Sequence, residues 1–201
     1  MIGFDYPTEP HVRRHGPEGY QDYESYRDWL RDEFTFRCVY SLHREQWYNR
    51  GGTFHVDHFV PLAADPDGRL AYSNLVYACG TCNEAKRDIL GIPDPCEVAF
   101  SDCVRVVRDG SVEALNGDGE MLIRCLCLNS KMNIQHRRRM IESLLTLRTA
   151  NPKLFQELLG FPDDLPDLRP PKRRVPRNSK PEGVEQSYLV LRERGKLPAT
   201  Y

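Results

Sequence analysis

The sequence predicts an α+β protein, and three local patterns carry that prediction. Large apolar side chains recur three and four residues apart over residues 20–34, apolar and polar residues alternate from Phe54, and an Asp109-Gly110 pair separates two β-branched runs. These patterns are typical of an amphipathic helix, a half-buried strand and a β-hairpin. A chain of 201 residues is long enough for one domain, or for one domain and a tail.

The composition excludes several classes of protein. With 40% hydrophobic and 28% charged residues the chain can bury a sizeable core, and its apolar stretches are too short to span a bilayer. A net charge of −1 means that any contact with nucleic acid must come from local patches. The N-terminus lacks the basic and apolar regions of a signal peptide, so we expect a cytoplasmic location, no membrane partner, and seven cysteines that serve as reduced thiols or metal ligands.

Residues 1–35 form the N-terminal segment, in which irregular chain precedes a helix at residues 20–34. The helix presents its large side chains on one face. They are Tyr23, Tyr26, Trp29, Leu30 and Phe34. We expect this face to pack as core rather than to stack on nucleic-acid bases.

Residues 93–160 form a predicted extension made of a hairpin and helices. The hairpin covers residues 103–115, a break follows at 116–119, and helical patterns cover 120–128 and 131–149. The last helix carries Lys131 and the run Arg137 to Arg139, which either faces solvent or contacts the DNA backbone.

Residues 161–201 form a predicted proline-rich, basic linker and tail. Seven of the fifteen prolines fall in residues 152–181, so residues 169–180 are expected to be extended or disordered. The basic run at residues 172–174 is suited to a nonspecific, salt-sensitive grip on nucleic acid.

Residues 36–92 are dense in cysteine, histidine and polar residues, and they carry the chemistry that the sequence predicts. The alternation from Phe54 to Val56 predicts a short strand that delivers Asp57 and His58 together at its end. A carboxylate there can hold a hard cation, and the adjacent imidazole can accept a proton near neutral pH.

A second group of functional side chains follows the predicted strand. Cys79-Gly80-Thr81-Cys82 is a knuckle that can grip zinc with two thiolates, and Thr81 is suited to cap a helix that begins there. Asn83, Lys86 and Arg87 then lie on one helical face. An amide oxygen, an ammonium and a guanidinium on one face suit a metal ion beside a phosphate.

The order of these residues resembles the HNH endonuclease family, in the variant whose motif begins with Asp-His and ends with asparagine. The residues that carry the resemblance are Asp57, His58, Asn74, Cys79, Cys82 and Asn83, and Phe36-Arg37-Cys38-Val39-Tyr40 resembles the first half of a zinc knuckle. The resemblance implies a ββα-metal (His-Me finger) nuclease core at residues 36–92, with two short strands and a helix around one divalent cation.

The resemblance also implies a metal-dependent endonuclease that cleaves DNA, with a role for each residue. It makes His58 the general base, Asn74 the residue that orients this base by a hydrogen bond, Asp57 and Asn83 the ligands of a catalytic Mg²⁺ or Mn²⁺, and Lys86 and Arg87 the contacts to substrate phosphate. Such small nucleases occur in restriction, phage defence and mobile elements.

The zinc knuckle is incomplete, because Ser41 stands where the family usually has a fourth cysteine. Cys38, Cys79 and Cys82 supply three thiolates, and His43 is the candidate that completes a structural zinc site. The alternative is a degenerate site in which packing replaces the metal.

Two other functions stay open at this stage. A zinc-knuckle module that binds nucleic acid or a partner protein without cutting would keep the thiols, but it would have no need of Asp57, His58 and Asn83 together. An RNA-directed nuclease would carry the same motif as a DNA-directed one.

Overall fold

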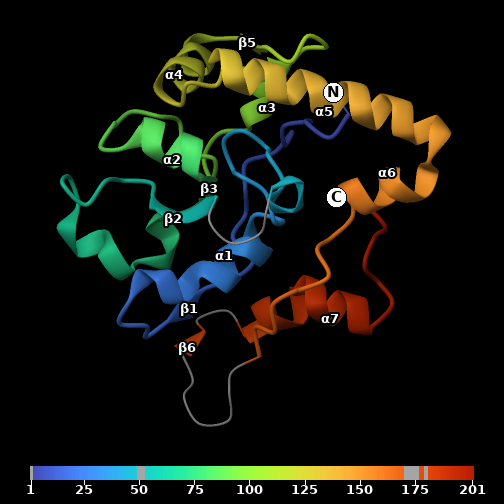
Figure 1. Cartoon of the computed structure of the whole chain (residues 1–201). Coiled ribbons are helices and arrows are strands. Elements are labelled where there is room, and N and C mark those ends of the chain that lie inside the picture. Colours follow the sequence, from blue (N-terminus) through green and yellow to red (C-terminus); the bar gives the residue numbers. More distant parts are fainter. Residues whose placement is uncertain (1, 49–52, 170–176, 179–180) are drawn as a thin grey trace.

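The computed structural model describes residues 2–48, 53–169, 177–178 and 181–201, and it confirms the α+β class (Figure 1). The helices are α1 (Arg27–Glu33), α2 (Gly80–Lys86), α3 (Phe100–Cys103), α4 (Gly117–Cys125), α5 (Lys131–Ala150), α6 (Pro152–Leu159) and α7 (Tyr188–Glu193). The strands form three antiparallel pairs: β1 (Pro17–Glu18) with β6 (Arg177–Asn178), β2 (Phe54–His58) with β3 (Leu75–Cys79), and β4 (Val104–Val106) with β5 (Val112–Ala114).

The hairpin of β2 and β3 lies at the centre of the molecule. Its register sets Phe54 opposite Cys79 and His58 opposite Leu75. The strand β3 is buried along its whole length, and α2 follows it directly, so this part of the chain runs strand, strand, helix. The order puts the thiol of Cys79 at one end of the hairpin and the imidazole of His58 at the other.

The predicted N-terminal helix is confirmed, with a later start. A 3₁₀ turn at Tyr23–Tyr26 leads into α1. The expected core face is buried at Tyr26, Trp29, Leu30 and Phe34. Tyr23 differs, since it is only half-buried and its ring contacts His58.

Two buried acidic residues at the end of α1 hold distant segments together. Glu33 accepts hydrogen bonds from the ring of His11 at 3.0 Å and from the hydroxyl of Tyr72 at 3.1 Å, so it ties the N-terminal segment to the loop between β2 and β3. Asp32 accepts a bond of 2.8 Å from the backbone N–H of Tyr188, at the start of α7. Burial raises the pKa of Glu33, but the hydrogen bonds from imidazole and backbone outweigh it and lower this pKa to about 2.

The predicted hairpin and helices of the C-terminal extension are confirmed, with one correction. β4 and β5 pair on either side of Gly110, whose φ is 87°. A Cβ at Gly110 would lie 2.4 Å from the backbone oxygen of Ile134, so only glycine lets this turn rest on α5. The expected break at 116–119 is wrong, because the Asn116 side chain caps α4 by accepting the N–H of Gly119 at 2.9 Å.

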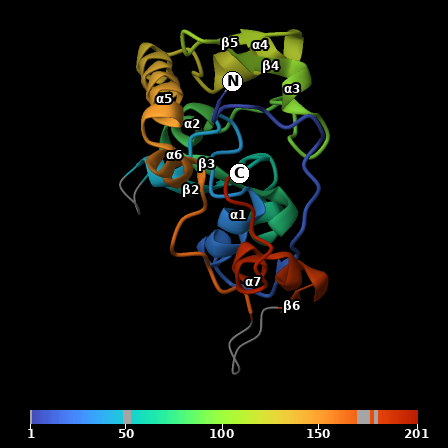
Figure 2. The same cartoon turned by 90° about the vertical axis from the view of Figure 1, so that its right-hand side faces the viewer.

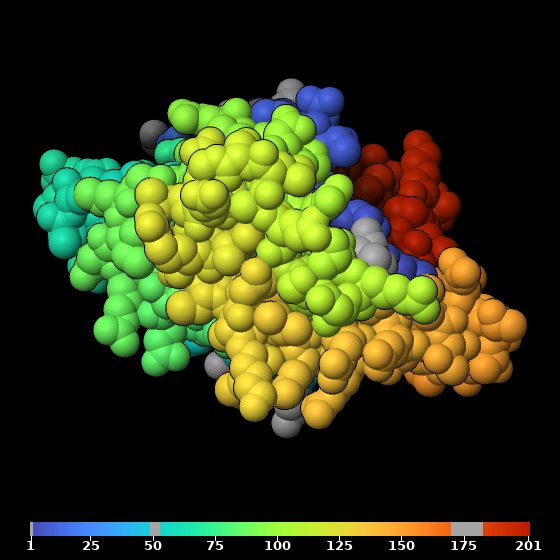
Figure 3. Space-filling view, turned by 90° about the horizontal axis from the view of Figure 1, so that it is seen from above, coloured from blue at the N-terminus to red at the C-terminus, as the bar shows by residue number. Residues whose placement is uncertain are grey.

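The basic run on α5 is only partly at the surface. Arg138 and Arg139 are exposed. Figure 3 shows that α5 shares one face of the molecule with α4 and the β4–β5 hairpin. Arg137 is fully buried, and its Nε donates to the carbonyl of Gly110 at 2.7 Å while its guanidinium also bonds the carbonyl of Leu128. The expectation that Arg137 faces solvent or DNA is therefore wrong, because its side chain is buried and its Nε and Nη2 bond the carbonyls of Gly110 and Leu128.

The C-terminal tail returns to the body of the molecule at two points. The helix α7 packs beside α1 (Figure 2). Tyr201 lies against the loop after α1 that runs from Cys38 to Arg44, here called the knuckle loop, and the guanidinium carbon of Arg44 is 3.9 Å from the centre of the Tyr201 ring. The basic run at residues 172–174 and most of the expected linker at 169–180 lie outside the described residues.

Candidate functional site

β2 ends on the two side chains that the motif singles out. Because successive residues of a strand point to opposite faces, Asp57 turns toward α2 and His58 turns toward the 3₁₀ turn before α1. The two functional groups therefore adjoin at the end of the strand and do not share one of its faces.

Asp57 belongs to a buried ion pair. Its Oδ1 lies 3.2 Å from Nζ of Lys86, at the end of α2, and its Oδ2 accepts a hydrogen bond of 3.1 Å from the hydroxyl of Tyr40. Nζ of Lys86 also donates to the backbone carbonyl of His58 at 2.6 Å. Burial raises the pKa of the Asp57 carboxyl, and the Lys86 ammonium opposes that shift.

The position of Lys86 corrects one expectation. The sequence suggested a surface ammonium that contacts substrate phosphate, but the Lys86 side chain is 0% exposed. The reason is the neighbouring carboxylate, because a buried charge is stable only beside an opposite one. In this structure Lys86 is the counterion of Asp57.

His58 is held in a defined orientation at the end of β2. Its Nε2 lies 3.0 Å from the backbone carbonyl of Arg69, and its ring meets the ring of Tyr23 edge-on with centroids 4.8 Å apart. A carbonyl oxygen only accepts, so Nε2 carries the proton and the lone pair is on Nδ1. An imidazole in this tautomer can accept a proton at Nδ1, which is the chemistry of a general base.

Asn74 does not make the expected hydrogen bond to His58. Its Oδ1 accepts from the N–H of Val60 at 2.7 Å, and its Nδ2 donates to the carbonyl of the same residue at 3.0 Å. This pair closes the base of the loop between β2 and β3, where a Cβ on Gly68 would lie 3.0 Å from Nδ2 of Asn74. Because Gly68 precedes Arg69, Asn74 can orient the imidazole only indirectly, through the loop that presents the Arg69 carbonyl.

The remaining residues of the motif lie on α2. The expected cap by Thr81 is wrong, because Cys79 is the N-cap and Thr81 lies in the first turn of the helix. Asn83 is half-buried, one turn before Lys86 and on the same side of the helix. Arg87 is exposed just past the end of the helix, with a φ of 44°.

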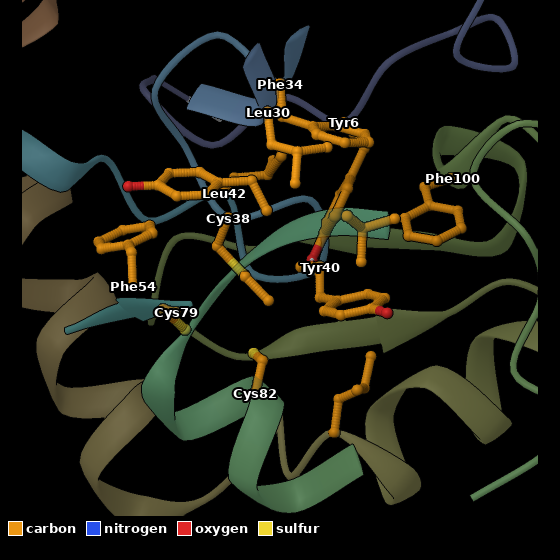
Figure 4. Packing of buried hydrophobic residues seen from close by; sticks show 14 of the residues in the cluster. Tyr6, Leu30, Phe34, Cys38, Tyr40, Leu42, Phe54, Cys79, Cys82 and Phe100 are labelled. Carbon is orange, nitrogen blue, oxygen red and sulfur yellow. The ribbon is translucent and has the colours of Figure 1, made fainter. Parts of the chain in front are cut away.

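Three buried thiols lie at the other end of the hairpin (Figure 4). The Sγ atoms of Cys38, Cys79 and Cys82 all lie within 4.8 Å of one another. Zinc–thiolate bonds of about 2.3 Å put the sulfurs of a tetrahedral site about 3.8 Å apart, so the group fits a zinc ion. Hydrogen bonds from Cys38 and Cys82 lower the pKa of Cys79, and burial raises that of Cys38 to about 11. The thiols come from the loop after α1, from β3 and from α2, so a metal ion would join three segments.

His43 does not belong to this group. Among the described residues, the cluster of metal-ligating side chains consists of the three cysteines. Nδ1 of His43 lies 2.8 Å from the hydroxyl of Tyr48, which also contacts Nε2 of His136 on α5 at 3.2 Å. Burial lowers the pKa of His43 to about 4. The structure therefore does not bring His43 into the thiol group: its Nδ1 bonds Tyr48, and its buried Nε2 has no hydrogen-bond partner among the described residues.

Three groups that contact the site residues were not predicted from the sequence. The hydroxyl of Tyr40 bonds Asp57, the ring of Tyr23 supports His58, and the carbonyl of Arg69 sets the tautomer of that imidazole. Tyr23 was visible only as one of several apolar residues on a helical face. The Arg69 carbonyl leaves no signal in a sequence, because every residue type has a backbone carbonyl.

Comparison with known proteins agrees with the motif. Residues 37–88 match the family model described as HNH endonuclease, which confirms the resemblance for that segment. An HNH domain indicates a nuclease-type or nucleic-acid-binding function, and HNH nucleases use divalent metals. A search of curated proteins returned no match to the chain. In the described ranges, every helix is too short or too polar to cross a bilayer.

Proposed function

We propose that this chain, which carries an HNH domain at residues 37–88, is a metal-dependent endonuclease that hydrolyses phosphodiester bonds of DNA. One observation carries the proposal: the carbonyl of Arg69, 3.0 Å from Nε2 of His58, keeps the proton there and the lone pair on Nδ1. Hydrolysis of a phosphodiester needs such a base for the attacking water, and positive charge beside the phosphate.

His58 takes the proton of the attacking water at Nδ1. The Arg69 carbonyl keeps accepting the hydrogen bond from Nε2, so it also stabilises the imidazolium that results. The edge of the Tyr23 ring restricts rotation of the imidazole. Asn74 contributes by closing the loop that carries the carbonyl, not by touching the imidazole.

Asp57 and Asn83 are the proposed ligands of the catalytic cation. A carboxylate and an amide oxygen suit Mg²⁺ or Mn²⁺. The carboxylate of Asp57 already lies beside a positive charge, because Nζ of Lys86 is 3.2 Å from Oδ1. The hydroxyl of Tyr40 bonds Oδ2 and so fixes the orientation of the carboxylate. When bound, the cation supplies charge stabilisation for the phosphate and for the departing oxygen.

Basic residues at the surface are the proposed contacts to the DNA backbone. Arg87 is exposed at the end of α2, and a guanidinium can bond two phosphate oxygens at once. Arg138 and Arg139 add exposed charge on α5. In this proposal residues 36–92 are the nuclease core, and the extension at residues 93–160 widens the surface that contacts DNA.

A cleavage assay tests the proposal directly. We expect the protein to nick supercoiled plasmid with Mg²⁺ or Mn²⁺ and to stop when EDTA is added. His58→Ala should lower the rate by about 10²–10⁴-fold, the range for loss of a general base, while its melting temperature stays close to that of the wild type. His55→Ala is the matched control, because His55 is a half-buried histidine of the same strand and has no proposed role.

The other outcomes separate the alternative functions. Cleavage of RNA but not of DNA, lost in His58→Ala, would make the chain an RNA-directed nuclease. If the protein binds DNA but does not cleave it with any divalent ion present, a zinc-knuckle binding module would be favoured. Plasmid nicking that is unchanged in His58→Ala, or that persists in EDTA, would contradict the assignment of the base or the metal.

A further inference from the structure

The side chain of Ser41 lies beside the three thiols, although serine is not one of the usual ligands of zinc. The hydroxyl of Ser41 lies 3.5 Å from Sγ of Cys79, and the backbone N–H of Ser41 donates to Sγ of Cys38 at the same distance. Ser41 is 1% exposed, so this oxygen lies in the core with the sulfurs.

The two halves of the knuckle are built alike. Cys38-Val39-Tyr40-Ser41 has the spacing of Cys79-Gly80-Thr81-Cys82. In the first half the N–H of Ser41 bonds the sulfur three residues earlier, and in the second half the backbone of Cys82 bonds Cys79 in the same way. By this correspondence Ser41 occupies in the first half the place that Cys82 occupies in the second.

The charge around the group favours three thiolates over four. Zinc with three thiolates leaves one net negative charge, whereas a fourth thiolate would leave two. Arg137 is a fully buried cation whose Nη1 has no hydrogen-bond partner among the described residues. Burial lowers the pKa of Arg137, and the nearby Tyr6 and Cys82 oppose that shift, so the guanidinium lies within electrostatic reach of the thiols.

We propose that Ser41 completes a zinc site of three thiolates and one hydroxyl, and that this site holds zinc more weakly than four thiolates would. A hydroxyl is neutral and hard, whereas a thiolate is charged and soft, so exchanging sulfur for oxygen weakens the bond to zinc. The proposal rests on the zinc knuckle of the proposed nuclease, but it is independent of cleavage. Its consequence is a knuckle whose folding depends on the supply of zinc.

Zinc affinity of the full chain, measured by competition with a chromogenic chelator, tests the proposal. We expect Ser41→Cys to bind zinc at least about tenfold more tightly than the wild type, and Ser41→Ala to bind it more weakly. His43→Gln should leave the affinity unchanged. Ser187→Cys is the matched control, because Ser187 is an equally buried serine at the cap of α7, away from the thiols.

Cobalt substitution reports the ligands themselves. The sulfur-to-cobalt charge-transfer band grows with the number of bound thiolates, so its intensity should correspond to three in the wild type and to four in Ser41→Cys. Equal affinity and equal band intensity in these two proteins would overturn the proposal. So would loss of zinc in His43→Gln, or a wild type that binds no zinc. None of these readouts uses cleavage, so a failure here is distinguishable from a failure of the nuclease assignment.

Discussion

The two ends of the β2–β3 hairpin carry different functional groups, and these groups differ in how far they are exposed to solvent. At the Cys79 end the three thiols and Ser41 are sealed in the core. At the His58 end a buried carboxylate and ammonium adjoin an imidazole that is half exposed. The difference shows that the groups at one end are closed off from solvent, while the other end leaves the imidazole of His58, the proposed general base, partly accessible.

The two ends are joined by one side chain. Tyr40 belongs to the knuckle loop between Cys38 and Ser41, yet its hydroxyl bonds the carboxylate of Asp57 at 3.1 Å. A disturbance of the thiol end therefore has a direct route to the orientation of this carboxylate. The predictions below test this comparison, from the largest expected effect to the smallest.

Removing the buried ammonium should have the largest effect on folding. Lys86→Met leaves the carboxylate of Asp57 buried without its counterion, so we expect the free energy of unfolding to fall by about 3–5 kcal/mol. Arg87→Met removes the neighbouring cation, which is exposed, and should cost less than about 0.5 kcal/mol. Urea denaturation of both variants is the measurement, and equal midpoints would show that the pair adds nothing to stability.

Cutting the link between the ends should have the next largest effect. Tyr40→Phe removes a hydrogen bond to a charged group and should cost about 1.5–3 kcal/mol. The same change in an Asp57→Asn background should cost less, because the charge that strengthens the bond is gone. A double-mutant cycle on unfolding free energies measures the coupling, and a coupling of zero would separate the two ends.

Acid should weaken the packing around His43, in the loop after α1. His43 is buried in its neutral form, with a pKa of about 4 against a usual 6.5, so its contribution to stability is present above pH 6.5 and is lost as the pH falls toward 4. The slope is at most about 1.4 kcal/mol per pH unit. As the pH falls from 6.5 to 4, the urea midpoint of the metal-free protein should fall less steeply for His43→Gln than for the wild type. Parallel curves for the two proteins would show that His43 does not cause this loss of stability.

Opening the base of the loop should have the smallest effect on folding. Asn74→Ala leaves the N–H and carbonyl of Val60 without their amide partner, at a cost of about 1 kcal/mol. Cleavage should fall by more than this cost implies, because the loop also presents the Arg69 carbonyl to His58. Melting temperature and nicking rate measured on the same preparation make the test, and a variant that keeps full activity would rule out an indirect role.

Local patterns explain why several elements were predictable. The alternation at Phe54, the Asp109-Gly110 turn and the apolar face of residues 20–34 each report contacts between near neighbours in the chain. The HNH motif was visible for the same reason, because its residues follow one another in a fixed order across a single hairpin and helix.

The errors arose where distant segments meet. The sequence does not show that the β4–β5 turn covers Arg137, or that Lys86 is paired with a buried carboxylate. The ring of His43 bonds Tyr48 and meets the ring of His136 on α5, which lies almost a hundred residues later in the sequence.

The sequence by itself determined the α+β class, the strand that ends on Asp57 and His58, and the three cysteines, because these depend on residue type and spacing alone. Only the tertiary structure decided which groups are partners: Lys86 with Asp57, the Arg69 carbonyl with His58, and Ser41 with the thiols. The physical reason is that burial and hydrogen bonding are set by segments far apart in the chain, whose approach no local spacing records.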